Sequence, residues 1–161
     1  ERAKYNLGVA NLALGKVKEA ADAFAKCAKD PDVENALGVV ALRNGQYAEA
    51  ARHFAASGNK DSKANMGVID VLNGNYAKAA SELADTDGCC YNKVLAYILN
   101  GQLDAASSAV MCNHDRVKYL KAIIAARQGK ADEAKALLNE ISGNAELAAR
   151  AAKDAEFAGL R

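Results

Sequence analysis

The sequence has no tryptophan, one proline, few aromatic residues and almost no net charge. Its 21 basic and 20 acidic side chains leave a formal charge of +1, so the chain lacks the basic surplus by which nucleic-acid-binding proteins attract phosphates. Its apolar runs are far shorter than the ~20 residues that cross a bilayer. We therefore expect neither a nucleic-acid partner nor a transmembrane segment.

The short motifs of common catalytic sites are also missing. The sequence contains no glycine-rich phosphate loop, no His-Glu-x-x-His and no Gly-x-Ser-x-Gly. His53 stands on an expected helix with no obvious acid or thiol partner in the sequence, which favours a half-buried or surface imidazole over a general base. We expect no enzymatic activity and no cofactor.

Alanine is abundant, at about a quarter of the residues, as is typical of closely packed helices. Five segments repeat a pattern in which a glycine is followed five residues later by alanine, and four residues after that by a larger apolar residue. The step of about 27 to 30 residues is typical of helical arrays. The glycines are Gly15, Gly45, Gly74, Gly101 and Gly129; the alanines are Ala20, Ala50, Ala79, Ala106 and Ala134; the apolar residues are Phe24, Phe54, Leu83, Val110 and Leu138.

Each repeat is predicted to be a helical hairpin. Apolar positions on both sides of the glycine have a period near 3.6 rather than 2, and glycine can take the left-handed conformation that closes a helix. The sequence thus predicts an all-α fold with one repeat domain over residues 1–161. Its repeats are expected at approximately 1–30, 31–59, 60–87, 88–114 and 115–142, with a C-terminal capping helix over 144–160.

These residues resemble the tetratricopeptide repeat family. The family pattern of Leu-Gly, Ala-x3-Phe and a later Pro is matched by Leu7-Gly8, Ala20 to Phe24 and Pro31. Leu37-Gly38 and Ala50 to Phe54 match again. The resemblance implies an α-solenoid of about five repeats that forms a right-handed superhelix, and a non-catalytic scaffold that binds a peptide or protein.

The resemblance also implies a concave groove lined by the first helix of each hairpin. Asparagine in such a groove can bond the backbone of an extended peptide, and tyrosine adds contact area at low entropy cost. The alternative is that these asparagines satisfy neighbouring repeats or only face water. The predicted groove residues are Tyr5, Asn6, Asn35, Arg43, Asn65, Tyr91, Asn92, Tyr119 and Arg127.

Three cysteines flank the fourth repeat, and their state is left open. The two ends of a hairpin lie close together, so Cys89 or Cys90 could form a disulfide with Cys112; buried thiols are the alternative. A metal site that adds His114 is disfavoured, because adjacent cysteines lack the Cys-x2-Cys spacing of zinc sites. Cys27 is expected to pack in the core.

Two further functions remain open besides groove binding. The chain can be a structural segment of a longer, envelope-associated parent, docking neighbouring domains through its ends or convex face; its start at Glu1, already in helical pattern, favours such a parent. A thiol redox module using Cys89 or Cys90 is the third hypothesis. The repeats are similar to those of bacterial envelope-associated proteins, which suggests the cell envelope or periplasm, with the cytoplasm as the alternative.

Overall fold

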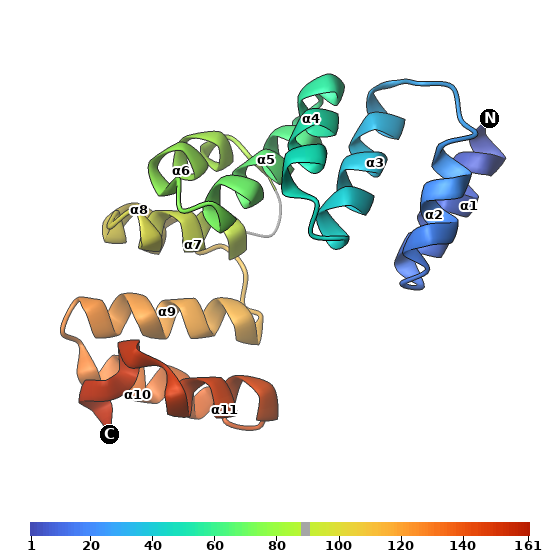
Figure 1. Cartoon of the computed structure of the whole chain (residues 1–161). Helices are drawn as coiled ribbons and strands as arrows, with labels where there is room; N and C mark the ends of the chain where they lie inside the picture. Colours follow the sequence, from blue (N-terminus) through green and yellow to red (C-terminus); the bar gives the residue numbers. More distant parts are fainter. Residues whose placement is uncertain (88–90) are drawn as a thin grey trace. The chain divides into compact units, whose positions relative to one another are not determined.

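The computed structural model describes residues 1–87 and 91–161, and within these it consists of helices and short connections without a strand (Figure 1). The all-α fold predicted from the helical period is therefore confirmed. The chain divides into two compact units, Glu1–Asn75 and Tyr76–Arg161. Each unit is described by itself.

The first unit contains two hairpins and the first helix of a third repeat. In each hairpin the two helices pack against each other, and the second helix also contacts the helix that follows (Figure 1). The helices begin and end within the predicted repeats: α1 (Arg2–Ala13), α2 (Val17–Phe24), α3 (Pro31–Arg43), α4 (Tyr47–Ser57) and α5 (Lys60–Leu72).

The second unit is built around α9, which contacts α7, α8, α10, α11 and the C-terminal 3-10 helix η1. Its helices are α6 (Tyr76–Ala84), α7 (Tyr91–Leu99), α8 (Leu103–Ala109), α9 (Asp115–Arg127), α10 (Ala131–Glu140), α11 (Ala145–Lys153) and η1 (Ala155–Leu160).

The repeated glycines end the first helix of each repeat in the way the sequence predicts. At the end of α3, Gly45 has a φ of 73°, and its N–H donates to the carbonyl of Leu42. The next N–H, of Gln46, donates 2.9 Å to the carbonyl of Ala41. This bond pair is the Schellman motif, which needs a left-handed residue at the glycine position. The same bonds and positive φ recur at Gly15, Gly74, Gly101 and Gly129.

Inside the hairpins, glycine makes room for phenylalanine. A Cβ added to Gly8 would lie 2.5 Å from the ring of Phe24, and one added to Gly38 would lie 2.5 Å from Cδ1 of Phe54. Both rings are only 1% exposed and fill the space between helices. The missing side chain therefore sets how closely the two helices of a hairpin approach.

The C-terminal segment differs from the single helix expected over 144–160. α11 ends at Lys153, and Asp154 takes an extended conformation with φ −71° and ψ 126°. Its carboxylate accepts a hydrogen bond from the N–H of Glu156 and so caps η1. The break turns the chain back onto α9, where Phe157 is buried against Tyr119.

Candidate functional site

The first unit places five predicted groove residues on its first helices, α1, α3 and α5; Arg43, at the end of α3, is described separately below. Tyr5 is half-buried and Asn6 exposed on α1, while Asn35 on α3 and Asn65 on α5 are half-buried. We call these four residues, together with Asp30, Asp32 and Asp61, the first-helix face. Asn35 and Asn65 are in direct contact, and Tyr5, Asn6, Asp30 and Asp32 line one pocket, as the following paragraphs describe.

Asn35 and Asn65 form a hydrogen bond between neighbouring repeats. Asn65 Nδ2 donates to Asn35 Oδ1 over 3.1 Å, and the buried hydroxyl of Ser62 donates to the same oxygen over 3.0 Å. Asn35 Nδ2 and Asn65 Oδ1 have no hydrogen-bond partner among residues 1–87 and 91–161. Half of each amide thus serves the repeat stack, and the other half has no partner in the described part of the chain.

A pocket of approximately 450 Å³ lies between α1 and the start of α3. Asp30 caps α3 by accepting from the N–H of Val33 over 2.8 Å, and Pro31 occupies the first helical position. This start places two aspartates beside Tyr5. The lining residues are Glu1, Arg2, Tyr5, Asn6, Cys27, Ala28, Asp30, Asp32 and Val33.

Tyr5 lies where apolar packing meets negative charge. Its ring contacts the buried ring of Phe24 with centroids 5.6 Å apart. Burial raises the pKa of its hydroxyl above the ordinary value, and three carboxylates raise it further, those of Asp32, Asp30 and Asp61.

Two predicted groove residues instead hold neighbouring repeats together. Arg43 donates from Nη1 to the carbonyl of Leu12 at the end of α1 over 2.6 Å, and Arg127 makes the equivalent bond to Ile98 at the end of α7 over 2.8 Å. Each arginine stands two residues before its turn glycine. Arg127 also forms a bidentate contact with Glu156. These guanidinium groups therefore donate hydrogen bonds to carbonyls in the last turn of the preceding first helices, where carbonyls lack partners within the helix.

The second unit repeats the pocket of the first one. Tyr91 and Asn92 on α7 stand ten and nine residues before Gly101, as Tyr5 and Asn6 stand before Gly15. Tyr91 is half-buried and Asn92 exposed. They line a pocket of approximately 820 Å³ with the segment that leads into α9, residues Asn113, His114, Asp115, Arg116 and Val117.

Tyr119 does not lie on an open groove, in contrast to its prediction as a groove residue. It has the same register as Tyr5 and Tyr91, but it is 2% exposed beneath the C-terminal segment. Its hydroxyl donates to Asp154 Oδ2 over 2.6 Å, its ring meets Phe157 edge-on, and the guanidinium of Arg150 lies 5.0 Å from the ring centre. The capping segment thus occupies the face that is exposed in earlier repeats.

The burial of Tyr119 predicts a loss of stability in alkali. Burial, and then the hydrogen bond and charge of Asp154, raise the pKa of its hydroxyl in the folded state. The folded protein therefore retains this proton where the unfolded chain loses it. We expect the free energy of unfolding to fall as the pH rises above about 10. Urea unfolding followed by circular dichroism should show that the free energy of unfolding falls less with pH in Tyr119→Phe than in the wild-type protein. An equal dependence on pH in the two proteins would contradict this prediction.

His53 has acidic partners that the sequence analysis did not identify. Its Nδ1 lies 2.7 Å from Oε2 of Glu34 on α3, and its Nε2 lies 3.3 Å from Oε1 of Glu49. The His53 and Glu34 side chains are 14% and 12% exposed. The spacing of Glu49 and His53, one helical turn apart, was the available signal; the Glu34 contact depends on how α3 packs on α4.

The structure describes only two of the four cysteines, Cys27 and Cys112. Cys89 and Cys90 lie outside the described residues, and with them the proposed disulfide and thiol chemistry. Cys112 is half-buried. Cys27 is also half-buried, and its thiol contacts the carbonyl of Ala23 at 3.5 Å while lining the Tyr5 pocket.

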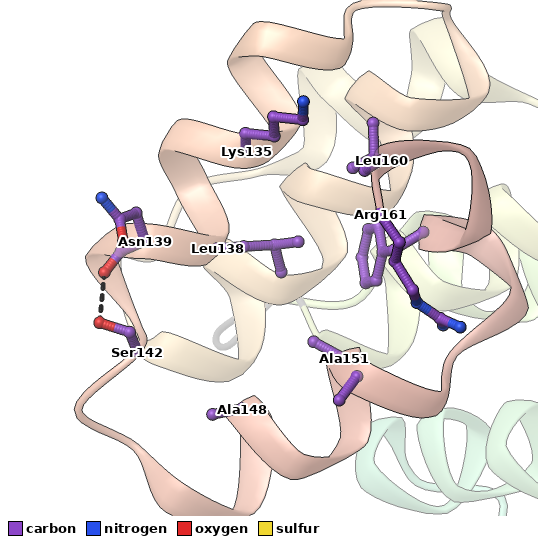
Figure 2. A pocket seen from close by; sticks show the side chains of 10 residues that line it. Lys135, Leu138, Asn139, Ser142, Ala148, Ala151, Leu160 and Arg161 are labelled. Atoms are coloured by element: carbon purple, nitrogen blue, oxygen red, sulfur yellow. Dashed lines mark hydrogen bonds between the residues drawn. The ribbon is translucent and has the colours of Figure 1, made fainter.

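A further pocket, which the sequence analysis missed, lies between α10, α11 and η1 and encloses approximately 440 Å³. Figure 2 shows Leu138 pointing from α10 into the space bordered by Ala151 and Leu160. Its only ionisable side chains are Lys135 and Arg161, so it contains no acid–base pair. Within residues 1–87 and 91–161 no three His, Cys, Asp or Glu side chains are grouped to hold a metal ion, and no helix could span a membrane.

Stacked helical hairpins with repeated turn glycines define a helical-repeat protein. Two family models, both described as tetratricopeptide repeat, match residues 2–32, and residues 34–56 and 116–140. The matched stretches are tetratricopeptide repeats. Comparison with curated proteins gives no match. Tetratricopeptide repeats are typically non-catalytic scaffolds, which indicates that this chain serves protein–protein interaction.

Proposed function

We propose that the chain binds a segment of a partner protein on the first-helix face. The observation that carries this proposal is the Asn35–Asn65 pair. Its hydrogen bonds fix both amides in place, and one donor, Asn35 Nδ2, and one acceptor, Asn65 Oδ1, have no partner within the described residues. An extended peptide presents alternating N–H and C=O groups that match this donor and acceptor. Pre-ordered side chains also reduce the entropy cost of binding.

The tyrosines support the same proposal. Tyr5 and Tyr91 are held at equivalent positions beside exposed asparagines, and each lines a concave site in its own unit. Half-buried tyrosine gives a rigid contact area with few torsions to order on binding. Arg43 and Arg127 bind preceding helices, and Tyr119 is covered, so we do not include these three residues in the proposed contact surface.

The test uses peptides selected from a random displayed library against the folded chain. Asn65→Ala removes the unpartnered acceptor, and Asn35→Asp keeps the acceptor for Ser62 while it removes the unpartnered donor. We expect the pair of changes to weaken peptide binding about thirtyfold, since each of the two lost hydrogen bonds contributes about 1 kcal/mol. Affinity is measured by isothermal titration calorimetry, and folding by thermal melting.

Asn139→Ala is the matched control, because this exposed asparagine lies on α10 in the other unit. It should leave binding unchanged. Unchanged affinity in the Asn35→Asp/Asn65→Ala protein, with folding intact, would refute the proposed contact surface.

One observation favours docking through an end of the array as a second candidate. Leu7 on α1 is 58% exposed, whereas Leu37, in the equivalent position on α3, packs half-buried against the core of the preceding hairpin. A neighbouring helix would bury Leu7 in the same way. Binding that survives the asparagine changes but is lost on Leu7→Gln would indicate this second mode.

A further inference from the structure

The two tyrosine–asparagine pockets have the same construction but different charge. In both, a Tyr-Asn pair on a first helix faces the segment that leads into the next first helix. By repeat register Asp30 corresponds to His114, and Asp32 to Arg116. The pocket in the first unit therefore has aspartates where the pocket in the second unit has a histidine and an arginine.

Among the carboxylates that line the first pocket, Glu1 forms an ion pair with Lys4, whereas Asp30 and Asp32 form none within the described part of the chain, not even with Arg2, which lines the same pocket. Asp30 uses one oxygen to cap α3, and Asp32 accepts from Asn59 Nδ2 over 3.2 Å. None of Asp30, Asp32 and Asp61 forms an ion pair with any residue in 1–87 or 91–161. The second carboxylate oxygen of Asp30 and of Asp32 remains available as an acceptor.

The second pocket carries charge of both signs. Asp115 accepts from Asn144 Nδ2 over 3.2 Å, as Asp32 does from Asn59, and the neighbouring Arg116 is cationic and lies 3.8 Å from the carboxylate of Glu146. The acidic excess is thus specific to the first pocket rather than a property of every such pocket in this chain. A helix face with uncompensated negative charge is complementary to a positive partner.

We propose that the Tyr5 pocket receives a lysine or arginine side chain of the bound partner, so that this end of the first-helix face selects a basic segment. The inference rests on the proposed function. A guanidinium or ammonium group donates to the free oxygens of Asp30 and Asp32, while the aliphatic part of the side chain packs on the ring of Tyr5. Arginine can engage a carboxylate with two parallel bonds, which favours it over lysine.

The inference is tested by amide NMR titration of the full chain with three capped octapeptides, in which glycine alternates with arginine, glutamate or serine. We expect the arginine peptide to shift the amide signals of Tyr5, Asn6 and Val33 and to leave those of Tyr91 and Asn92 in place. Raising the salt concentration should weaken this binding, because the charges are partly exposed.

The decisive variant is Asp30→Asn/Asp32→Asn. Asparagine caps helices as well as aspartate does, and it retains an oxygen for Asn59, so the variant removes two charges and preserves the local bonds. Binding of the arginine peptide should weaken about fivefold, as expected for two partly exposed charge contacts. The matched control, Asp132→Asn/Glu133→Gln on the exposed first turn of α10, changes the net charge equally and should retain binding.

Three results would overturn the inference: equal affinity for the serine or glutamate peptide, unchanged binding of the arginine peptide by Asp30→Asn/Asp32→Asn, or no shift at the Tyr5 pocket. The library-selected peptides test the proposed function independently of this inference. Selected peptides that lack lysine and arginine but depend on Asn65 would sustain the first-helix face and remove only the cation assignment. If binding of the selected peptides does not depend on Asn65, the proposal that the first-helix face binds the partner is wrong.

Discussion

Gly38→Ala should lower the free energy of unfolding, although alanine is the better helix former. Alanine gains about 1 kcal/mol over glycine inside a helix. Here its Cβ would lie 2.5 Å from Cδ1 of Phe54, a ring that is 1% exposed and cannot swing into solvent. Overpacking of this kind costs about 1–3 kcal/mol, so we expect a net loss of stability that urea unfolding can measure.

A second substitution makes this prediction specific. The equivalent positions in the fifth repeat are Ala122 and Leu138, so this chain already pairs alanine with leucine. Phe54→Leu alone should cost about 1 kcal/mol through lost contacts. The double variant Gly38→Ala/Phe54→Leu should lose less stability than the sum of the losses in the two single variants. Additive losses would show that the two side chains do not compete for one space.

Asp154→Ala should have the other large effect, in the second unit. Asp154 accepts from the buried hydroxyl of Tyr119 through one oxygen and caps η1 through the other. Loss of the cap costs about 1 kcal/mol, and an unsatisfied buried hydroxyl costs about 1–3 kcal/mol. We therefore expect a loss of about 2–4 kcal/mol, together with faster hydrogen exchange at Phe157.

Two variants separate the contributions of Asp154. Asp154→Asn retains a cap and a polar partner for Tyr119, so it should fall between wild type and alanine. Tyr119→Phe removes the hydroxyl and its bond but leaves the cap. Asp132→Ala, at an exposed site on α10, is the control and should have little effect on stability. An Asp154→Ala protein that is as stable as this control would contradict the prediction.

The helical hairpins could be predicted because their determinants are local. The turn glycines and the following alanines recur at nearly constant spacing, and the bonds at Gly45 involve residues within five positions. Small residues opposite Phe24 and Phe54 follow from the same repeat. The end of the capping helix at Asp154 was missed, because the signal there depends on a buried partner, Tyr119, 35 residues earlier.

The candidate site could be predicted only in part, because side chains with equal register meet different neighbours. Tyr5, Tyr91 and Tyr119 share one position in the repeat, but only Tyr119 has η1 packed over it. Arg43 and Arg127 reach carbonyls about 30 residues away, which no local pattern shows. The asparagine prediction was closer: both expected uses, partner binding and inter-repeat bonding, have atoms available in Asn35 and Asn65.

The bond from Arg43 to Leu12 has a consequence for dissecting this protein. The last turn of α1 is completed by a residue 31 positions further along the chain, in the following hairpin. An excised α1–α2 fragment would lose that donor as well as the buried faces of Ala36 and Val40. The smallest fragment of this end of the array that keeps these contacts therefore has four helices, residues 1–57. Truncated proteins should end after α4 rather than after α2.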